Sequence, residues 1–230
     1  MGQEMAKKNV NQPSQGLSRR EREKLQRRNS IVDAAQKRFF ANGFDGVSMD
    51  DIASDLELTK PALYRYFRNK ESLYFAVVLR GMAILRDTLK TAVDEEGTGR
   101  GKALGFMEGF CFDYVCKHPD YYTMLNVARE KRFVDMFVRG EIDGAHEFGM
   151  MAFESLTLLV EAVRLGAKDG TLREDLDPLK TAIFLVVTVE ATINLTPVYE
   201  NLVTQQGISK EDYLRHAIDL MLHGIASTEA

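Results

Sequence analysis

The chain has 230 residues, 45% of them hydrophobic and 28% charged, which is enough to bury a core and ordinary for a soluble globular protein. Five prolines and no Trp argue against a many-turned β-sandwich. The net charge of −4 is unevenly spread, since residues 1–70 carry 14 Lys and Arg against 9 Asp and Glu, whereas residues 71–230 carry 16 against 25. A basic end on an acidic body indicates contact with a polyanion such as nucleic acid, with chance segregation of charge as the alternative.

The chain begins with a polar segment that is followed by a helical pattern. Residues 1–18 are polar and lack hydrophobic periodicity, which predicts a mobile tail. From Arg19 apolar residues recur at spacings of three and four, as expected for a helix with one buried face, and Gly43 is suited to end it. That face consists of Ile31, Ala34, Ala35 and Phe39.

Three residues suited to cap helices follow at short intervals. Ser48, with an acidic residue three positions later, predicts the start of a short helix. Thr59 predicts the start of another, which we expect to reach about Phe67. Asn69 then predicts a long helix that ends near Glu95. Its buried stripe is expected to comprise Leu73, Ala76, Val77, Met82, Leu85 and Leu89.

The remainder of the chain also has a helical pattern, interrupted by Gly and Pro. Helices are expected near 101–117, 119–138, 143–168, 178–197 and 209–225. The run 181–195 is rich in β-branched residues, but its length and its helical flanks favour a buried helix over a strand. The expected fold class is therefore all-α.

The stretch Ser48–Phe67 has the spacing of a helix-turn-helix. Two short helices would meet across a turn of about three residues, with Ala53 small enough for a close crossing and Leu63 filling their shared core. The second helix of this motif enters a DNA major groove, which is about 12 Å wide. Its outer face would present polar groups, a methyl group and aromatic hydroxyls suited to base edges and phosphates. These residues are Thr59, Lys60, Ala62, Tyr64, Arg65 and Tyr66.

Further patterns surround this motif. An Ala-x3-Phe-x3-Gly-aromatic pattern is present as Ala35, Phe39, Gly43 and Phe44. A hydroxyl cap followed by Ile-Ala is present as Ser48, Ile52 and Ala53. A Leu-Tyr-x-His/Tyr-Phe-x-x-Lys-x-x-Leu pattern runs from Leu63 to Leu73. In this order over nearly 40 positions, the patterns resemble the tetracycline-repressor (TetR-type) family of transcription regulators, with the match covering about residues 25–85.

The resemblance implies a domain order and roles for individual residues. Residues 19–70 would form a three-helix DNA-binding domain, joined by a long helix to an effector-binding and dimerisation domain over 71–230. Ser48 and Tyr66 would hold phosphates, and Lys70 would face the DNA backbone. The surface that reads the bases would consist of Thr59, Lys60, Ala62, Tyr64 and Arg65.

The chain departs from the family pattern at two places near the turn. The family usually has Ala-Gly where this chain has Leu56-Glu57, and a non-Gly residue in a left-handed conformation costs roughly 1–2 kcal/mol. Pro61 replaces a frequent Gly, which stiffens the helix start and removes an amide that could bond a phosphate. Upstream, six basic residues are either a solvated helix end or an arm that adds DNA contacts. They are Arg19, Arg20, Arg22, Lys24, Arg27 and Arg28.

Residues 106–153 are dense in aromatic side chains and Met. Ordinary core packing accounts for most of them, but in TetR-type proteins this region encloses an effector cavity, and adaptable Met walls suit bulky apolar molecules. The expected effector-binding residues are Phe106, Phe110, Tyr114, Tyr122, Met124, Phe137, Met150 and Phe153. Few charges lie nearby, so a hydrophobic effector is expected rather than a phosphorylated metabolite.

The stretch Gly170–Pro178 is similar to the family's entry to its dimerisation helices. The helices near 178–197 and 209–225 would then pair with their mates in a four-helix bundle of a homodimer. The residues expected at this interface are Phe184, Val187, Ala191, Leu214 and Leu222.

Other classes of function find little support. Cys111 and Cys116 complete neither a zinc set nor a disulfide scaffold, and buried free thiols in a reducing cytoplasm are expected. The N-terminus lacks an apolar signal core, and the run 181–195 is interrupted by Glu190 and shorter than the roughly 20 residues that span a bilayer. No nucleophile elbow or Cys–His pair is found. We therefore expect a cytoplasmic protein with no enzymatic activity, no cofactor and no metal.

The sequence thus predicts a homodimeric DNA-binding regulator that binds a palindromic operator in double-stranded DNA and represses until a hydrophobic effector binds. The alternative is a ligand-independent DNA-binding adaptor whose C-terminal body docks a protein partner. A tightly packed body would favour the adaptor, whereas a cavity would favour the sensor.

Overall fold

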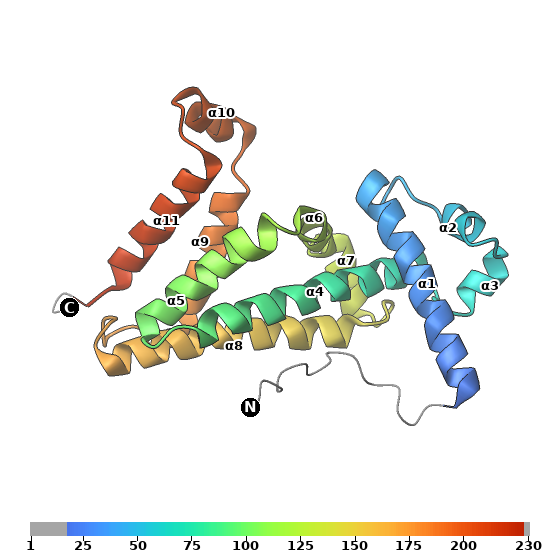
Figure 1. The fold of residues 1–230 in the computed structure, drawn as a ribbon, viewed down its shortest axis with the longest axis horizontal. Coiled ribbons are helices and arrows are strands. Elements are labelled where there is room, and N and C mark those ends of the chain that lie inside the picture. The colour runs from blue at the N-terminus through green and yellow to red at the C-terminus, as the bar shows by residue number, and fades with distance from the viewer. Residues whose placement is uncertain (1–17, 228–230) are drawn as a thin grey trace, which may run out of the picture.

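The computed structural model describes residues 18–227, which form eleven α-helices and one π-helical segment (Figure 1). Within this range no β-strand is formed, as the sequence predicted. The predicted tail, residues 1–18, lies outside the described residues except for Ser18. The Ser18 hydroxyl accepts a hydrogen bond from the Glu21 amide at 3.3 Å and caps the first helix.

The N-terminal unit consists of three helices packed around a small apolar core, at one end of the molecule (Figure 1). They are α1 (Arg19–Asn42), α2 (Met49–Asp55) and α3 (Lys60–Tyr64). The α1 helix ends before Gly43, whose φ of 67° suits a residue without a side chain. The α3 helix is shorter than predicted. Its last turn tightens as the amides of Tyr66 and Phe67 both bond the Leu63 carbonyl, which turns the Phe67 ring into the core.

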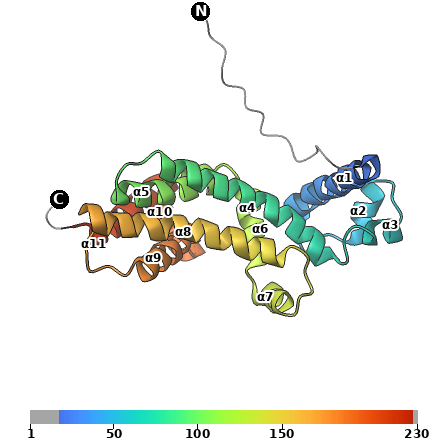
Figure 2. The same cartoon turned by 90° about the horizontal axis from the view of Figure 1, so that it is seen from below.

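The long helix α4 (Lys70–Asp94) connects this unit to the body. It starts where predicted, at Asn69, whose side-chain oxygen accepts a hydrogen bond from the Ser72 amide at 2.8 Å. It runs beside α8 (Ala145–Asp169) along most of the body (Figures 1 and 2). All six residues of its predicted stripe are buried. The α4 helix therefore packs against both the N-terminal unit and the body.

Two predicted helices of the body differ from the observed ones. The helix predicted at 101–117 is α5 (Gly99–Glu108) followed by a π-helical segment, Gly109–Val115. The helix predicted at 119–138 is broken into α6 (Pro119–Ala128) and α7 (Lys131–Val138). The break occurs because Glu130 adopts an extended conformation, with a ψ of 147°. This bend allows Phe133 of α7 to pack edge-on against Phe44 of the N-terminal unit, at 5.0 Å between ring centroids.

The C-terminal helices are α9 (Pro178–Ile193) and α11 (Lys210–Ile225), close to prediction, with an unpredicted α10 (Pro197–Gln205) between them. None of the α10 residues is buried, and this helix projects beyond the body (Figure 1). Across the described range, no single helix is long and apolar enough to cross a membrane. The α9 and α10 helices pass that test of length and composition only as a pair bent by 70°.

Candidate nucleic-acid interface and internal cavity

The α2–turn–α3 segment has the geometry of a helix-turn-helix. Ser48 caps α2 in a capping box with Asp51, and the Thr59 hydroxyl accepts a hydrogen bond from the Ala62 amide at 3.4 Å at the start of α3. Glu57, in the turn between the helices, has a φ of 53°. Within residues 18–227 it is the only non-glycine residue with a positive φ. This left-handed turn is the position at which the sequence departs from the Ala-Gly of the family pattern, so the predicted strain is present.

The side chains of α3 divide into a buried and an outer set. Leu63 and Phe67 are buried, as predicted for core residues. Of the predicted reading surface, Thr59, Lys60, Tyr64 and Arg65 are exposed and Ala62 is half-buried; Tyr66 is also half-buried. The Tyr64 side chain is 43% exposed, so its hydroxyl and ring edge face solvent. The outer face of α3 therefore presents aromatic, hydroxyl and cationic groups to solvent.

Three of the predicted DNA contacts are already engaged within the protein. The Lys60 ammonium lies 2.7 Å from a carboxylate oxygen of Asp50, and this hydrogen bond raises the pKa of Lys60. The Ser48 hydroxyl donates to Asp51 at 2.6 Å, which lowers the pKa of that carboxyl. The Lys70 ammonium donates to two backbone carbonyls at 2.9 Å each and lies over an aromatic ring, where it closes the loop between α1 and α2. Lys70 therefore has a structural role in this loop, which the sequence did not reveal.

A row of cations lies on the N-terminal half of α1, which extends past the rest of the unit. We define the basic ridge as Arg20, Lys24 and Arg27, which share one helical face because they are spaced by four and three residues. All three are exposed and have no hydrogen-bond or ion-pair partner among residues 18–227. The neighbouring Arg28 guanidinium lies 4.7 Å from the centre of the Phe67 ring, so this face is on the same side as the helix-turn-helix.

Polar contacts join the N-terminal unit to the body. Arg132 of α7 pairs with Asp45 at 3.0 Å, and this interaction lowers the pKa of the Asp45 carboxyl. Arg80 of α4 pairs with Asp33 of α1 at 2.7 Å. These contacts, together with the shared aromatic core, fix the angle at which the helix-turn-helix leaves the body.

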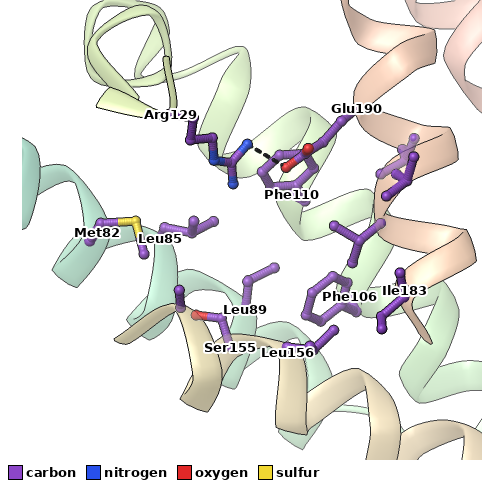
Figure 3. A pocket seen from close by; sticks show the side chains of 14 residues that line it. Met82, Leu85, Leu89, Phe106, Phe110, Arg129, Ser155, Leu156, Ile183 and Glu190 are labelled. Atoms are coloured by element: carbon purple, nitrogen blue, oxygen red, sulfur yellow. Dashed lines mark hydrogen bonds and ion pairs between the residues drawn. The ribbon is translucent and has the colours of Figure 1, made fainter. Parts of the chain in front are cut away.

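The body contains a cavity of about 220 Å³ between α4, α5, α8 and α9, which is partly open to solvent (Figure 3). Arg129 and Glu190, which form an ion pair at 2.6 Å, provide its charged groups, and Ser155 contributes a hydroxyl that already bonds the Met151 carbonyl. The rest of the lining is apolar and consists of Met82, Leu85, Leu89, Phe106, Phe110, Ala152, Leu156, Ile183, Val186, Val187 and Val189. The lining of the cavity is therefore almost entirely apolar.

The structure brings two of the eight predicted effector residues, Phe106 and Phe110, to this cavity. The other six lie elsewhere. Tyr114, Tyr122 and Met124 are buried in the surrounding core, and Phe137 packs against Phe75 at 4.4 Å between ring centroids. Met150 and Phe153 are on the outer face of α8, where they are 46% and 66% exposed.

The cavity also has lining residues that the sequence reasoning missed. Arg129 precedes the break between α6 and α7, and a continuous helix was predicted there. Glu190 did give a signal, because it interrupts the most apolar run of the chain. A charge in such a run calls for a partner nearby in space, although sequence alone did not show which residue it was.

The predicted interface residues on α9 and α11 fall into two groups. Phe184, Val187 and Ala191 are exposed on the outer face of α9, as a contact surface requires. Leu214 and Leu222 of α11 are only 2% and 3% exposed, because they pack on the chain's own core. Their burial within the chain leaves little of either side chain for a partner, and their place at an interface stays a prediction.

Residues 18–227 contain no group of three or more His, Cys, Asp or Glu side chains that could hold a metal ion. Both cysteines are free, but only Cys111 is buried as predicted, whereas Cys116 is exposed. Burial raises the pKa of the Cys111 thiol to about 12, so it is inert at neutral pH.

Residues 31–77 match the family described as "Bacterial regulatory proteins, tetR family". Over 158 residues the chain is 27% identical to the HTH-type transcriptional activator FasR of Mycolicibacterium smegmatis, covering 60% of this chain and 71% of FasR. Over 191 residues it is 25% identical to the HTH-type transcriptional repressor SCO4008 of Streptomyces coelicolor, covering 82% of this chain and 88% of SCO4008. The fold is similar to that of the transcriptional regulator FadR from Bacillus subtilis in complex with stearoyl-CoA, with a TM-score of 0.64, 18% identity, and 86% and 98% coverage.

Proposed function

We propose that this chain, which belongs to the TetR-type transcriptional regulators, is a repressor that binds a palindromic operator as a homodimer and is released by a hydrophobic effector. The observation that carries the DNA-binding part is the outer face of α3. There Thr59, Tyr64 and Arg65 are exposed on a helix that is supported from behind by Leu63. A major groove accepts a helix in this presentation.

Homodimerisation is supported by the outer face of α9. Leu179, Ile183, Phe184 and Val187 are each between 46% and 59% exposed, and an apolar strip of this kind on a folded chain marks an interaction site. A two-fold protein fits a two-fold operator, and members of this family bind DNA as dimers.

Release by an effector is supported by the cavity and its position. The cavity walls include α4, which continues into the core of the N-terminal unit. A ligand that favours one arrangement of the body would therefore change the distance between the two α3 helices of the dimer. The fraction of dimers whose α3 helices fit the operator would then change. The presence of this cavity favours the sensor over the alternative, a ligand-independent adaptor that docks a protein partner.

Selection of bound fragments from genomic DNA, followed by footprinting, tests the proposal. We expect a two-fold symmetric site that overlaps a promoter, with protein bound as a dimer. Addition of an apolar compound that raises the melting temperature is expected to weaken operator binding. Sites without symmetry, or stabilising ligands that never change operator affinity, would contradict the dimer and the sensor respectively.

A further inference from the structure

The two charged residues in the cavity lining neutralise each other. The ion pair joins Nη1 of Arg129, which follows α6, to Oε1 of Glu190, in the middle of α9, at 2.6 Å (Figure 3). The Arg129 side chain is 40% exposed and that of Glu190 is 24% exposed, so the pair lies where the cavity meets solvent. The remaining walls are almost entirely apolar. In its present form the cavity therefore carries no net charge.

This neutrality sets a condition on the charge of a ligand. A ligand carboxylate that approaches Arg129 would either lie beside the like charge of Glu190 or displace it, and a ligand ammonium that approaches Glu190 would meet the like charge of Arg129 in the same way. Either arrangement adds a like-charge repulsion or breaks the ion pair, beside apolar walls such as Phe106 and Phe110 that solvate a charge less well than water does. An uncharged ligand leaves the ion pair intact.

The ion pair still has hydrogen-bonding capacity to offer. A guanidinium has five N–H donors, and within residues 18–227 the Arg129 side chain donates to Glu190 from Nη1. The remaining N–H groups are available to an uncharged acceptor such as an ester or ketone oxygen. A bond to a charged donor is stronger than one between two neutral groups.

A second donor without an acceptor lies near the same end. Tyr114 is fully buried. In the described part of the chain, its hydroxyl is the only buried side-chain polar atom without a hydrogen-bond partner. Burial raises the pKa of Tyr114, and the nearby positive charge of Arg129 opposes that rise. Tyr114 also stacks on Phe110, which is part of the cavity wall. Tyr114 is not itself part of the cavity lining, so its unpaired hydroxyl lies behind the wall that Phe110 forms.

On the basis of the effector role proposed above, we infer that the effector is an uncharged, largely apolar molecule with one carbonyl-type acceptor that bonds a free N–H of Arg129. The Arg129–Glu190 pair acts as a filter, because it disfavours cationic and anionic amphiphiles of the same shape. The class comprises esters, ketones and lactones with an aliphatic body.

Isothermal titration of the full chain with three matched probes tests this inference. The probes are methyl decanoate, decanoate and decylamine, each below its aggregation concentration and at neutral pH. We expect the wild-type protein to bind the ester at least about tenfold more tightly than either charged probe. The Glu190→Gln variant leaves Arg129 as the lone charge and should bind decanoate best. The Arg129→Gln variant leaves Glu190 alone and should bind decylamine best.

The exposed ion pair between Arg164 and Glu161 of α8 provides matched controls. The Arg164→Gln and Glu161→Gln variants make the same changes outside the cavity lining and should keep the wild-type order of affinities. The inference is overturned if the wild-type protein prefers a charged probe or binds none of the three. It is also overturned if Glu190→Gln and Arg129→Gln leave the order of affinities unchanged. The order of affinities of the wild-type protein for the three probes is measured without any variant. The inference therefore remains testable even if a variant fails to fold.

Operator titrations in the presence of each probe separate this inference from the proposed function. If charged and uncharged probes bind equally and all weaken operator binding, the charge filter is wrong and the sensor stands. If the ester binds as expected but leaves operator affinity unchanged, the ligand class is right and the sensor is wrong.

Discussion

The hydroxyl of Tyr121 in α6 donates a hydrogen bond to the side-chain oxygen of Gln36 in α1, at 3.0 Å. Arg80 of α4 donates to the same oxygen, also at 3.0 Å, so three helices meet at one acceptor. Gly81 makes this possible, since a Cβ there would lie 2.8 Å from the Tyr121 ring. Because Arg129 of the cavity lining directly follows α6, this contact is a polar link between the cavity and the N-terminal unit.

Replacement of Tyr121 by Phe should weaken the coupling between effector and operator while each still binds alone. The ring keeps its packing, and only the hydrogen bond to Gln36 is lost. Coupling free energies are typically about 1–3 kcal/mol, so a several-fold loss in the effector's influence on operator affinity is measurable. Operator titrations with and without effector provide the measurement. Tyr213→Phe, a half-buried tyrosine of α11 at the far end of the body, is the control. Equal coupling in both variants would argue against this link.

Replacement of Tyr64 or Lys60 by Ala should abolish specific binding without loss of helicity. Good base contacts are worth about 1–3 kcal/mol each, and a dimer makes each contact twice. Lys60 must leave Asp50 to reach DNA, so Asp50→Asn should strengthen binding by removing both a competitor and a repulsive charge. Gel-shift titrations measure the operator affinity of each variant, and circular dichroism measures its helicity. Full-strength binding by the Lys60/Tyr64 double variant would contradict the assignment of α3.

Replacement of the three basic-ridge residues by Gln should reduce the salt dependence of DNA binding. Each lost phosphate contact lowers the slope of log K against log salt by about 0.9. The control changes Arg19, which pairs with Glu23, together with Arg22 and Lys37, which all lie off the ridge, so both variants lose three positive charges. Titrations at several salt concentrations measure the slopes. Equal slopes in the two triple variants would mean that the ridge makes no special contact and is a solvated helix end.

A charge on the outer face of α9 should split the dimer, whereas a charge on the buried face of α11 should prevent folding. Phe184 is 55% exposed and outside the cavity lining, so Phe184→Lys is expected to give a folded monomer. Leu214 is 2% exposed, and Leu214→Lys should unfold the chain because it buries an unpaired ammonium. Light scattering and circular dichroism test both, with Val134→Lys on α7 as the surface control. A Phe184→Lys dimer would exclude this face.

Replacement of Glu57 by Gly should stabilise the protein by up to about 1 kcal/mol. A φ of 53° costs a non-Gly residue roughly 1–2 kcal/mol, and part of the gain is offset because glycine is more flexible in the unfolded chain. Glu57→Val should have the opposite effect, since a β-branched side chain tolerates this conformation least. Urea unfolding measures both changes. Equal stability of the three proteins would show that the turn relaxes in solution.

The sequence predicted the N-terminal unit well because its signals are local. Ser48, Thr59 and Asn69 each cap the helix expected of them, and Glu57 takes the strained conformation that its position requires. Capping and turn chemistry act within four residues and therefore can be read from the chain.

The body was harder to predict because its signals depend on which surface each face meets. The apolar face of α11 looked suitable for a dimer, but Leu214 is covered by the chain's own helices. The break at Glu130 has no Gly or Pro to mark it, and it accompanies the packing of Phe133 on an aromatic ring that is distant in the sequence. The pairing of Arg129 with Glu190 joins positions 61 residues apart, which no local pattern indicates.

Ile183 and Val187 belong to two surfaces, because they line the cavity and are also 46% and 59% exposed on the outer face of α9. A second protomer placed on that face would rest against the cavity wall. Self-association and effector binding then become linked equilibria, so the effector affinity depends on the protein concentration. A cell that makes more of this regulator would thereby change the effector level at which its genes respond, without any change in sequence.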